Sequence, residues 1–249
     1  MSKASVGGLP PLAIRAWLRY VVVERVFQRI APRTVLEVGC GQGAIGARLA
    51  QHSEYVAVEP DDSSYAVAAS RIEPSGGTVI HGVHADVAAG STFDVVCAFE
   101  VLEHLEHDDQ ALEEWVASIR PGGHLVMSVP AFQSRFGPMD ENAGPFRRYE
   151  PDELRAQLER AGLTDVETTV YGWPLGYALE AVRNRIDARK LARRDATMED
   201  LTFASGRTFQ PPNRIVGLAV AVLVRPFCLL QRLRPDRGIG LVVSARKPA

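Results

Sequence analysis

Short β-rich apolar runs alternate with helical patterns through most of this 249-residue chain. Seven runs have the length and composition of strands, at 34–38, 55–58, 78–83, 93–99, 124–129, 166–171 and 240–245. Helical spacing occurs between or before most of them, at 12–32, 45–50, 63–71, 108–120 and 151–162. Strands that alternate with helices predict a mostly parallel sheet with helices on both faces. We therefore expect an α/β fold with a seven-stranded sheet.

The length fits one domain with an insertion, because single α/β domains reach roughly 250 residues. We expect an N-terminal helix in 1–32, the core in 33–171, a helical insertion in 172–237, and the last strand and tail in 238–249. The longest apolar run, 215–224, is interrupted by Arg225 and Pro226, and it is shorter than the roughly 20 residues that span a bilayer. The sequence therefore predicts no transmembrane segment.

The turn after the first strand, Glu37-Val38-Gly39-Cys40-Gly41-Gln42-Gly43, carries the strongest site signal. Glycines at the end of a strand allow a tight turn and let a ligand approach the backbone, and the following helix offers unpaired N–H groups. Residues 41–46 also satisfy GxGxxG, the dinucleotide fingerprint. A dinucleotide site has its first glycine directly after the strand and no anion near the pyrophosphate. Here Gly39 already ends the strand and Glu37 precedes it, which favours a cationic ligand.

Residues 35–43 resemble motif I of the class I S-adenosylmethionine-dependent methyltransferases, an acidic residue followed by GxGxG. The resemblance extends over 35–162 and includes Glu100-Val101-Leu102-Glu103-His104 after the fourth strand, which is similar to small-molecule O-methyltransferases of the ubiquinone-biosynthesis type. It implies a Rossmann-like fold and S-adenosylmethionine as cofactor. The residues that it implies for cofactor binding are Glu37, Gly39, Gly41, Gly43, Glu59, Asp86, Val87 and Glu100.

Three of these acids have separate expected roles. Glu37 would orient the cationic amino group of the methionyl moiety. Glu59, at the end of the second strand, can accept hydrogen bonds from both ribose hydroxyls. Asp86 resembles the family's aspartate that accepts from the adenine amine, although a plain surface turn explains it nearly as well.

The end of the fourth strand also indicates the chemistry. Methyltransferases that act on amide or nucleobase nitrogen often carry Asn/Asp-Pro-Pro-aromatic there, whereas this chain has Phe99-Glu100-Val101-Leu102, which favours oxygen or carbon. His104 is the expected catalytic base, and a packing role is the alternative. Glu100, Glu103 and His104 together could hold Mg²⁺, because carboxylate oxygens suit that ion.

The loop 131–149 follows the fifth strand at the edge where ligands enter. In the family a histidine follows the glycine near its end, and here Pro145 stands in that place. The catalytic role of that histidine therefore does not transfer. Arg147, Arg148 and Tyr149 remain as candidates for contact with the acceptor, and a solvated turn is the alternative.

The insertion joins a basic segment to the apolar run 215–230. The basic segment consists of Arg183, Arg185, Arg189, Lys190, Arg193 and Arg194. Such a combination can form a cap on the N-terminal helix, a lid over the acceptor, or a surface that binds a membrane. We favour the cap or lid over the membrane surface.

The overall expectation is an O-methyltransferase whose acceptor is a small-molecule hydroxyl, either of a saccharide or of a quinone precursor. A net charge of −2 supplies no positive electrostatic field that would attract a nucleic acid. The three cysteines match neither a disulfide pattern nor a metal-binding pattern, and no export signal is visible, so we expect a cytoplasmic protein. The alternatives are a nicotinamide-dependent oxidoreductase and a non-catalytic protein that binds the cofactor or docks on a membrane. The sequence leaves the oligomeric state open.

Overall fold

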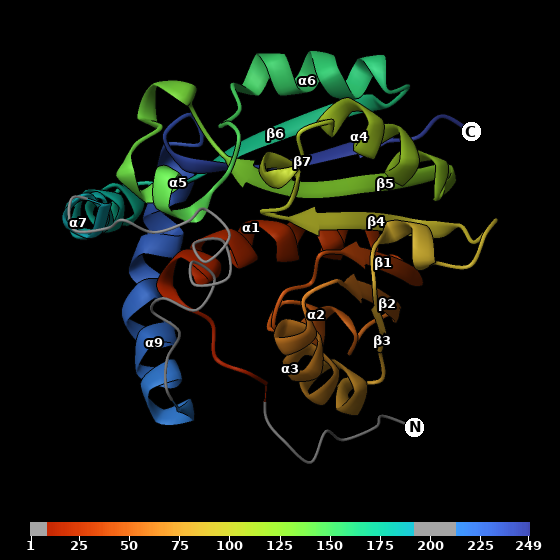
Figure 1. Cartoon of the computed structure of the whole chain (residues 1–249), viewed down its shortest axis with the longest axis horizontal. Helices are drawn as coiled ribbons and strands as arrows, with labels where there is room; N and C mark the ends of the chain where they lie inside the picture. The colour runs from red at the N-terminus through yellow and green to blue at the C-terminus, as the bar shows by residue number, and fades with distance from the viewer. Residues whose placement is uncertain (1–8, 192–212) are drawn as a thin grey trace.

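The computed structural model describes residues 9–191 and 213–249. Its centre is a seven-stranded sheet in the order β3-β2-β1-β4-β5-β7-β6 (Figure 1). The strands are β1 Thr34–Val38, β2 Glu54–Glu59, β3 Thr78–His81, β4 Phe93–Phe99, β5 Ile119–Pro130, β6 Thr164–Gly172 and β7 Gly238–Arg246. Strand β7 runs antiparallel to β5 and β6, and the other pairs are parallel. The predicted fold class is confirmed.

Helices cover both faces of this sheet. They are α1 Ile14–Ile30, α2 Gly46–Leu49, α3 Asp62–Ile72, α4 Asp108–Ala117, α5 Pro138–Ala143, α6 Pro151–Arg160, α7 Leu175–Leu191 and α9 Arg214–Leu230. Local side-chain chemistry explains where two of these helices begin. Asp61 caps α3 by accepting from the N–H of Ser64 at 2.8 Å, and Pro151 occupies the first turn of α6. Most helices and strands begin and end within a few residues of their predicted boundaries.

Two elements differ from the expectation. Strand β5 begins at Ile119, five residues before the predicted start at His124, and α5 forms inside the segment that the sequence indicated as a loop. Pro138 suits the first turn of α5, and Asp140 accepts a hydrogen bond from the N–H of Gly137 at 2.9 Å. These start signals lie in a glycine- and proline-rich stretch, where the sequence favoured a turn.

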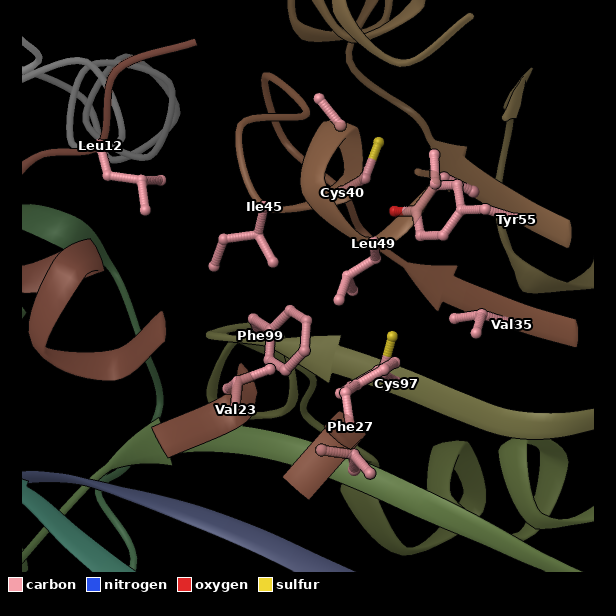
Figure 2. Close-up of a cluster of buried hydrophobic side chains, with 14 of the residues drawn as sticks. Leu12, Val23, Phe27, Val35, Cys40, Ile45, Leu49, Tyr55, Cys97 and Phe99 are labelled. Carbon is pink, nitrogen blue, oxygen red and sulfur yellow. The ribbon is translucent and has the colours of Figure 1, made fainter. Parts of the chain in front are cut away.

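Two apolar cores lie on opposite faces of the sheet. One joins α1, the glycine loop and β2, and Figure 2 shows Phe27 of α1 with Cys40, Leu49 and Tyr55 of that region. The other packs α4 and α6 on the strands, with Trp115 buried among them. The first core therefore holds the glycine loop and the N-terminal helix as one unit.

The insertion between β6 and β7 contains α7 and α9. Helix α7 packs against α5, and α9 packs along α1. Arg225 and Pro226 interrupt the apolar run in the sequence, but helix α9 continues through both residues to Leu230. Arg193 and Arg194 of the basic segment lie outside the described residues, as do residues 1–8.

Candidate functional site

A cavity of about 560 Å³ opens at the carboxyl ends of β1, β2 and β4. The strand order reverses between β1 and β4, and ligands of open α/β sheets bind at such a position. One half of the cavity is lined by the glycine loop and the end of β2. The other half is lined by the start of α1, the turn after β4, the segment around α5, and Arg183 of α7. The volume suits a small-molecule site.

The glycine loop turns tightly beside β2. Gly39 has a φ of +69°, and a Cβ there would lie 2.8 Å from a γ-carbon of Val101, so a side chain meets both strain and a clash. The N–H of Gly41 donates to Glu59 at 2.7 Å. Gly39, Gly41 and Gly43 all line the cavity. Their predicted part in cofactor binding agrees with this place and stays a prediction.

Glu37 lines the same cavity and is 2% exposed. Its carboxylate accepts a hydrogen bond from the hydroxyl of Tyr55. Burial raises the pKa of Glu37 to about 7, while Tyr55 and the charge of Arg19 oppose the shift. A buried carboxylate with this pKa lacks a full counter-charge, so a bound ammonium group would stabilise its ionised form.

Glu59 supports the loop from the end of β2. Besides Gly41, its carboxylate accepts from the N–H of Asp61 at 3.1 Å. Each carboxylate oxygen has a second lone pair, so two hydroxyl groups of a ligand could still donate to it. This is the arrangement expected for a ribose contact.

Asp86 and Val87 do not line the cavity. The carboxylate of Asp86 accepts from the N–H of Val83 at 2.8 Å and ends a turn on the exposed surface. The alternative of a surface turn therefore describes its place in the structure. A contact of Asp86 or Val87 with adenine stays a prediction.

Glu100 follows β4 with a φ of +61°, which non-glycine residues rarely adopt. Its Oε1 lies 3.2 Å from Nη1 of Arg19 and accepts from the hydroxyl of Ser128 at 2.9 Å. Although burial acts to raise it, the charges of Arg19 and Arg15 hold the pKa of Glu100 below its ordinary value. Glu100 is therefore an ionised residue that lines the cavity and forms an ion pair with Arg19 of α1.

This pairing contradicts the predicted magnesium site. Across 9–191 and 213–249, the structure brings no three acidic, histidine or cysteine side chains into a group that could hold a metal ion. Glu100 is neutralised by Arg19, and burial with the nearby charge of Glu100 raises the pKa of Glu103 well above its ordinary value. A Glu100 that is already paired with Arg19 and a buried Glu103 whose charged form is disfavoured fit a hard cation poorly.

Glu103 and His104 are among the residues that line the cavity. Within residues 9–191 and 213–249, Oε2 of Glu103 and Nδ1 of His104 are buried and have no hydrogen-bond partner. Burial lowers the pKa of His104, and the charge of Glu100 together with a hydrogen bond to the backbone of Gly144 only partly offsets this. A neutral imidazole with a free buried nitrogen can accept a proton from a ligand. The role of His104 as a catalytic base stays a prediction.

The loop 131–149 lines the cavity through α5 and Pro145, but the candidates at its end face elsewhere. Arg147 lies 2.9 Å from Asp108, and the hydroxyl of Tyr149 donates to the same carboxylate at 2.8 Å. Arg148 is fully buried between Asp140 and Glu180. The predicted acceptor contacts of these three residues are wrong, because their polar groups are used to fix the loop.

Sequence reasoning missed four cavity or support residues. These are Arg15, Arg19, Tyr55 and Arg183. Arg15 and Arg19 lie one turn apart on α1, and charged residues beside the apolar stripe of that helix were the available signal. Arg183 was noted as part of a basic segment, without a place in the site. Nothing in the sequence around Tyr55 distinguishes it from an ordinary core tyrosine.

The pKa of Glu37 gives a testable pH dependence of stability. Between its ordinary value of 4.5 and about 7, the folded chain keeps a proton on Glu37 that the unfolded chain has released. The free energy of unfolding should fall as pH rises through this window, by up to about 1.4 kcal/mol per pH unit. Glu37→Gln should remove this contribution. Urea titrations of both proteins across the window check it, and equal slopes would contradict it.

Sequence comparison supports the resemblance that motif I suggested. The model of a family described as a methyltransferase domain matches residues 36–125. A probable S-adenosylmethionine-dependent methyltransferase of Mycolicibacterium smegmatis is 35% identical over 62% of this chain and 61% of its own length. A ubiquinone biosynthesis O-methyltransferase of a Methylobacterium species is 27% identical over 62% of this chain and 70% of its own. The chain spans 56–61% of the length of the mycobacterial relatives that it matches.

A solved structure with a similar fold completes the comparison. The N-methyltransferase NodS from Bradyrhizobium japonicum, in complex with S-adenosylhomocysteine, matches with a TM-score of 0.57. The match covers 93% of this chain and 86% of that one at 17% sequence identity. This likeness concerns the fold alone and says nothing of the acceptor atom.

Proposed function

Since the chain belongs to the class I S-adenosylmethionine-dependent methyltransferases, we propose that it transfers a methyl group to the hydroxyl oxygen of a small molecule, with His104 as the base. The observation that carries the proposal is the shared cavity. The glycine loop, Glu37 and Glu59 line one half of it, while Glu103, His104 and Arg15 line the other. One cavity could therefore hold the methyl donor and the acceptor side by side.

The cofactor half is suited to a nucleoside with a cationic tail. Glu59 would accept from the ribose hydroxyls, and Glu37 would pair with the ammonium group. When bound, S-adenosylmethionine supplies an electrophilic methyl group on a positively charged sulfur. The glycine loop lets the ligand approach the backbone, and Glu100 closes the wall between the two halves.

The acceptor half supplies the proton acceptor. As the new carbon–oxygen bond forms and the carbon–sulfur bond breaks, the hydroxyl proton passes to Nδ1 of His104. The lowered pKa of His104 keeps the imidazole neutral and ready to accept at neutral pH. Glu103, whose charged form is disfavoured by burial and by the charge of Glu100, can hold a second polar group of the acceptor. No metal ion takes part.

A phenolic acceptor of the quinone-precursor kind is favoured over a saccharide. Arg15 lines the acceptor half of the cavity, and within residues 9–191 and 213–249 its guanidinium donates to the sulfur of Met139 at 3.0 Å, which is a weak acceptor. A cation with so weak a partner favours an acceptor that becomes anionic, and phenols ionise more readily than sugar hydroxyls. The similarity to ubiquinone biosynthesis O-methyltransferases supports the same choice.

The test is a transfer assay with probe acceptors of defined chemistry. The protein is incubated with S-adenosylmethionine and 3,4-dihydroxybenzoate, methyl glucoside or phosphoethanolamine, and S-adenosylhomocysteine is quantified. We expect turnover with the diphenol, and the same rate after treatment with EDTA. Transfer to the amine but to no hydroxyl compound would contradict the proposal, and loss of activity with EDTA that Mg²⁺ restores would contradict its metal-free form.

A further inference from the structure

Helix α9 has one face fixed in the domain. Gly217, Val224, Cys228 and Gln231 are buried on the side that packs along α1. A Cβ on Gly217 would lie 2.3 Å from Cβ of Pro11, so the two segments are in close contact. The side chain of Gln231 donates to the carbonyl of Leu18 at 3.0 Å, which ties the end of the helix down. The orientation of α9 is therefore set by the fold.

The opposite face of α9 and the turn that follows it is apolar and exposed. The large apolar residues on it are Ile215, Val216, Leu218, Val222, Leu223, Leu229, Leu230 and Leu233, which are 38–81% exposed. A soluble monomer ordinarily has no apolar patch larger than roughly 300–600 Å², and eight such side chains on one short element exceed this. We call this set the α9 apolar face. A surface of this kind marks an interaction site.

Basic charge accompanies the apolar face. Residues 214–237 contain five arginines and one aspartate, a balance of +4 in a chain whose net charge is −2. Arg225 and Arg232 are exposed and lie seven residues apart, so they follow one edge of the helix beside Leu218 and Leu229. An apolar face with arginines along its edge complements an anionic lipid surface, where the acyl boundary meets negative headgroups.

The geometry favours a helix in the plane of the membrane over one that crosses it. Residues 215–233 are long and apolar enough for a span, with a mean hydropathy of 1.7, but 22% of that window is buried in the protein. A crossing helix would have to leave α1 and expose Gln231 to lipid. We propose that the α9 apolar face docks the domain on an anionic lipid bilayer, with the helix axis parallel to the surface.

Docking would place the candidate site near the lipid. Pro11, which contacts Gly217 of α9, also lines the cavity, as does Arg15 on the next part of α1. Figure 1 shows α7 and α9 at the end of the molecule where α1 begins. The mouth on the acceptor side therefore lies beside the helix that meets the membrane, and a lipid-soluble acceptor could reach it directly.

The experiment is vesicle sedimentation of the full chain, which needs no activity and is independent of the proposed reaction. Vesicles of phosphatidylcholine with about a third phosphatidylglycerol are compared with phosphatidylcholine alone. We expect binding to the anionic vesicles that weakens at high salt. Arg225→Gln with Arg232→Gln should weaken partitioning about fivefold for each arginine, and Leu218→Ser with Leu223→Ser at least about tenfold in total.

Matched variants on distant surfaces serve as controls. Arg160→Gln on α6 and Val83→Ser after β3 change an exposed arginine and a 52% exposed valine away from α9, and they should leave partitioning within about twofold. Thermal unfolding checks that every variant is folded.

Three results would overturn the proposal. Wild-type protein that stays in the supernatant with anionic vesicles excludes docking. If the variant with Leu218→Ser and Leu223→Ser binds the vesicles as well as wild type does, the α9 apolar face does not contact the lipid, and binding comes from basic charge on another surface. A wild-type dimer that dissociates when Leu218 and Leu223 are replaced, and that does not sediment with lipid, assigns the α9 apolar face to a second copy of the chain.

Discussion

Replacement of His104 by asparagine is expected to lower the turnover number about 100- to 10,000-fold, the range typical for loss of a positioned general base. The reason is the proposed role: His104 lines the cavity, and its buried Nδ1, which has no hydrogen-bond partner among the described residues, would take the hydroxyl proton. Asparagine keeps polarity and approximate size but cannot act as a base at neutral pH. Affinity for S-adenosylhomocysteine should change by less than about threefold, because His104 lies on the acceptor side.

The pH profile and a neighbouring histidine distinguish catalysis from packing. Because burial lowers the pKa of His104, the acid limb of the turnover profile should lie below the ordinary histidine value, and it should vanish in the variant. His107→Asn is the matched control, since His107 is exposed three residues further on. Turnover by the His104 variant within a few-fold of wild type would show that His104 only packs the turn.

Replacement of Arg148 by methionine is expected to lower the free energy of unfolding by about 3–5 kcal/mol, the cost of breaking a buried ion pair from one side. Arg148 is fully buried and lies 2.7 Å from both Asp140 and Glu180. Methionine fills similar space but leaves two buried carboxylates without that cation. Glu180 still pairs with Arg135 in this variant, so the larger part of the lost stability should come from the unpaired carboxylate of Asp140.

Urea unfolding measures this loss, with an exposed arginine as the reference. Arg160→Met on α6 should change the free energy of unfolding by less than about 0.5 kcal/mol. The Arg148 network joins α5 to α7, and both line the acceptor half of the cavity, so any folded variant should also show weaker acceptor binding. A loss similar to that of Arg160→Met would show that the network contributes nothing to stability.

The fold, and the position of the glycine loop beside Glu37 and Glu59, could be predicted because their signals are local. Strands β1 and β4 begin and end where the sequence indicated, since each is a short apolar run with a polar residue or a turn at its carboxyl end. The parallel order of the strands then brings Glu37 and Glu59 to one edge of the sheet, as the resemblance implied. The positions of the strand ends were sufficient to predict that these two carboxylates lie close together.

The acceptor half could not be predicted because its contacts join distant segments. Glu100 was interpreted as a metal ligand from its neighbours in sequence, but its partner is Arg19 of the N-terminal helix. Arg148 was predicted to contact the acceptor for the same reason, but its side chain is buried and paired with Glu180 of α7. Spacing along the chain carries no information about such pairs. Arg225 and Pro226 likewise interrupt the apolar run in the sequence, whereas helix α9 continues through both.

The central claim is that the cavity above β1 and β4 holds the methyl donor, and a calorimetric titration with S-adenosylhomocysteine tests it most directly. We predict one binding site per chain, an affinity that rises with pH through about 7 as Glu37 ionises, and a loss of about 10- to 100-fold in Glu37→Gln. No binding heat from the folded wild-type chain at millimolar ligand would contradict the claim.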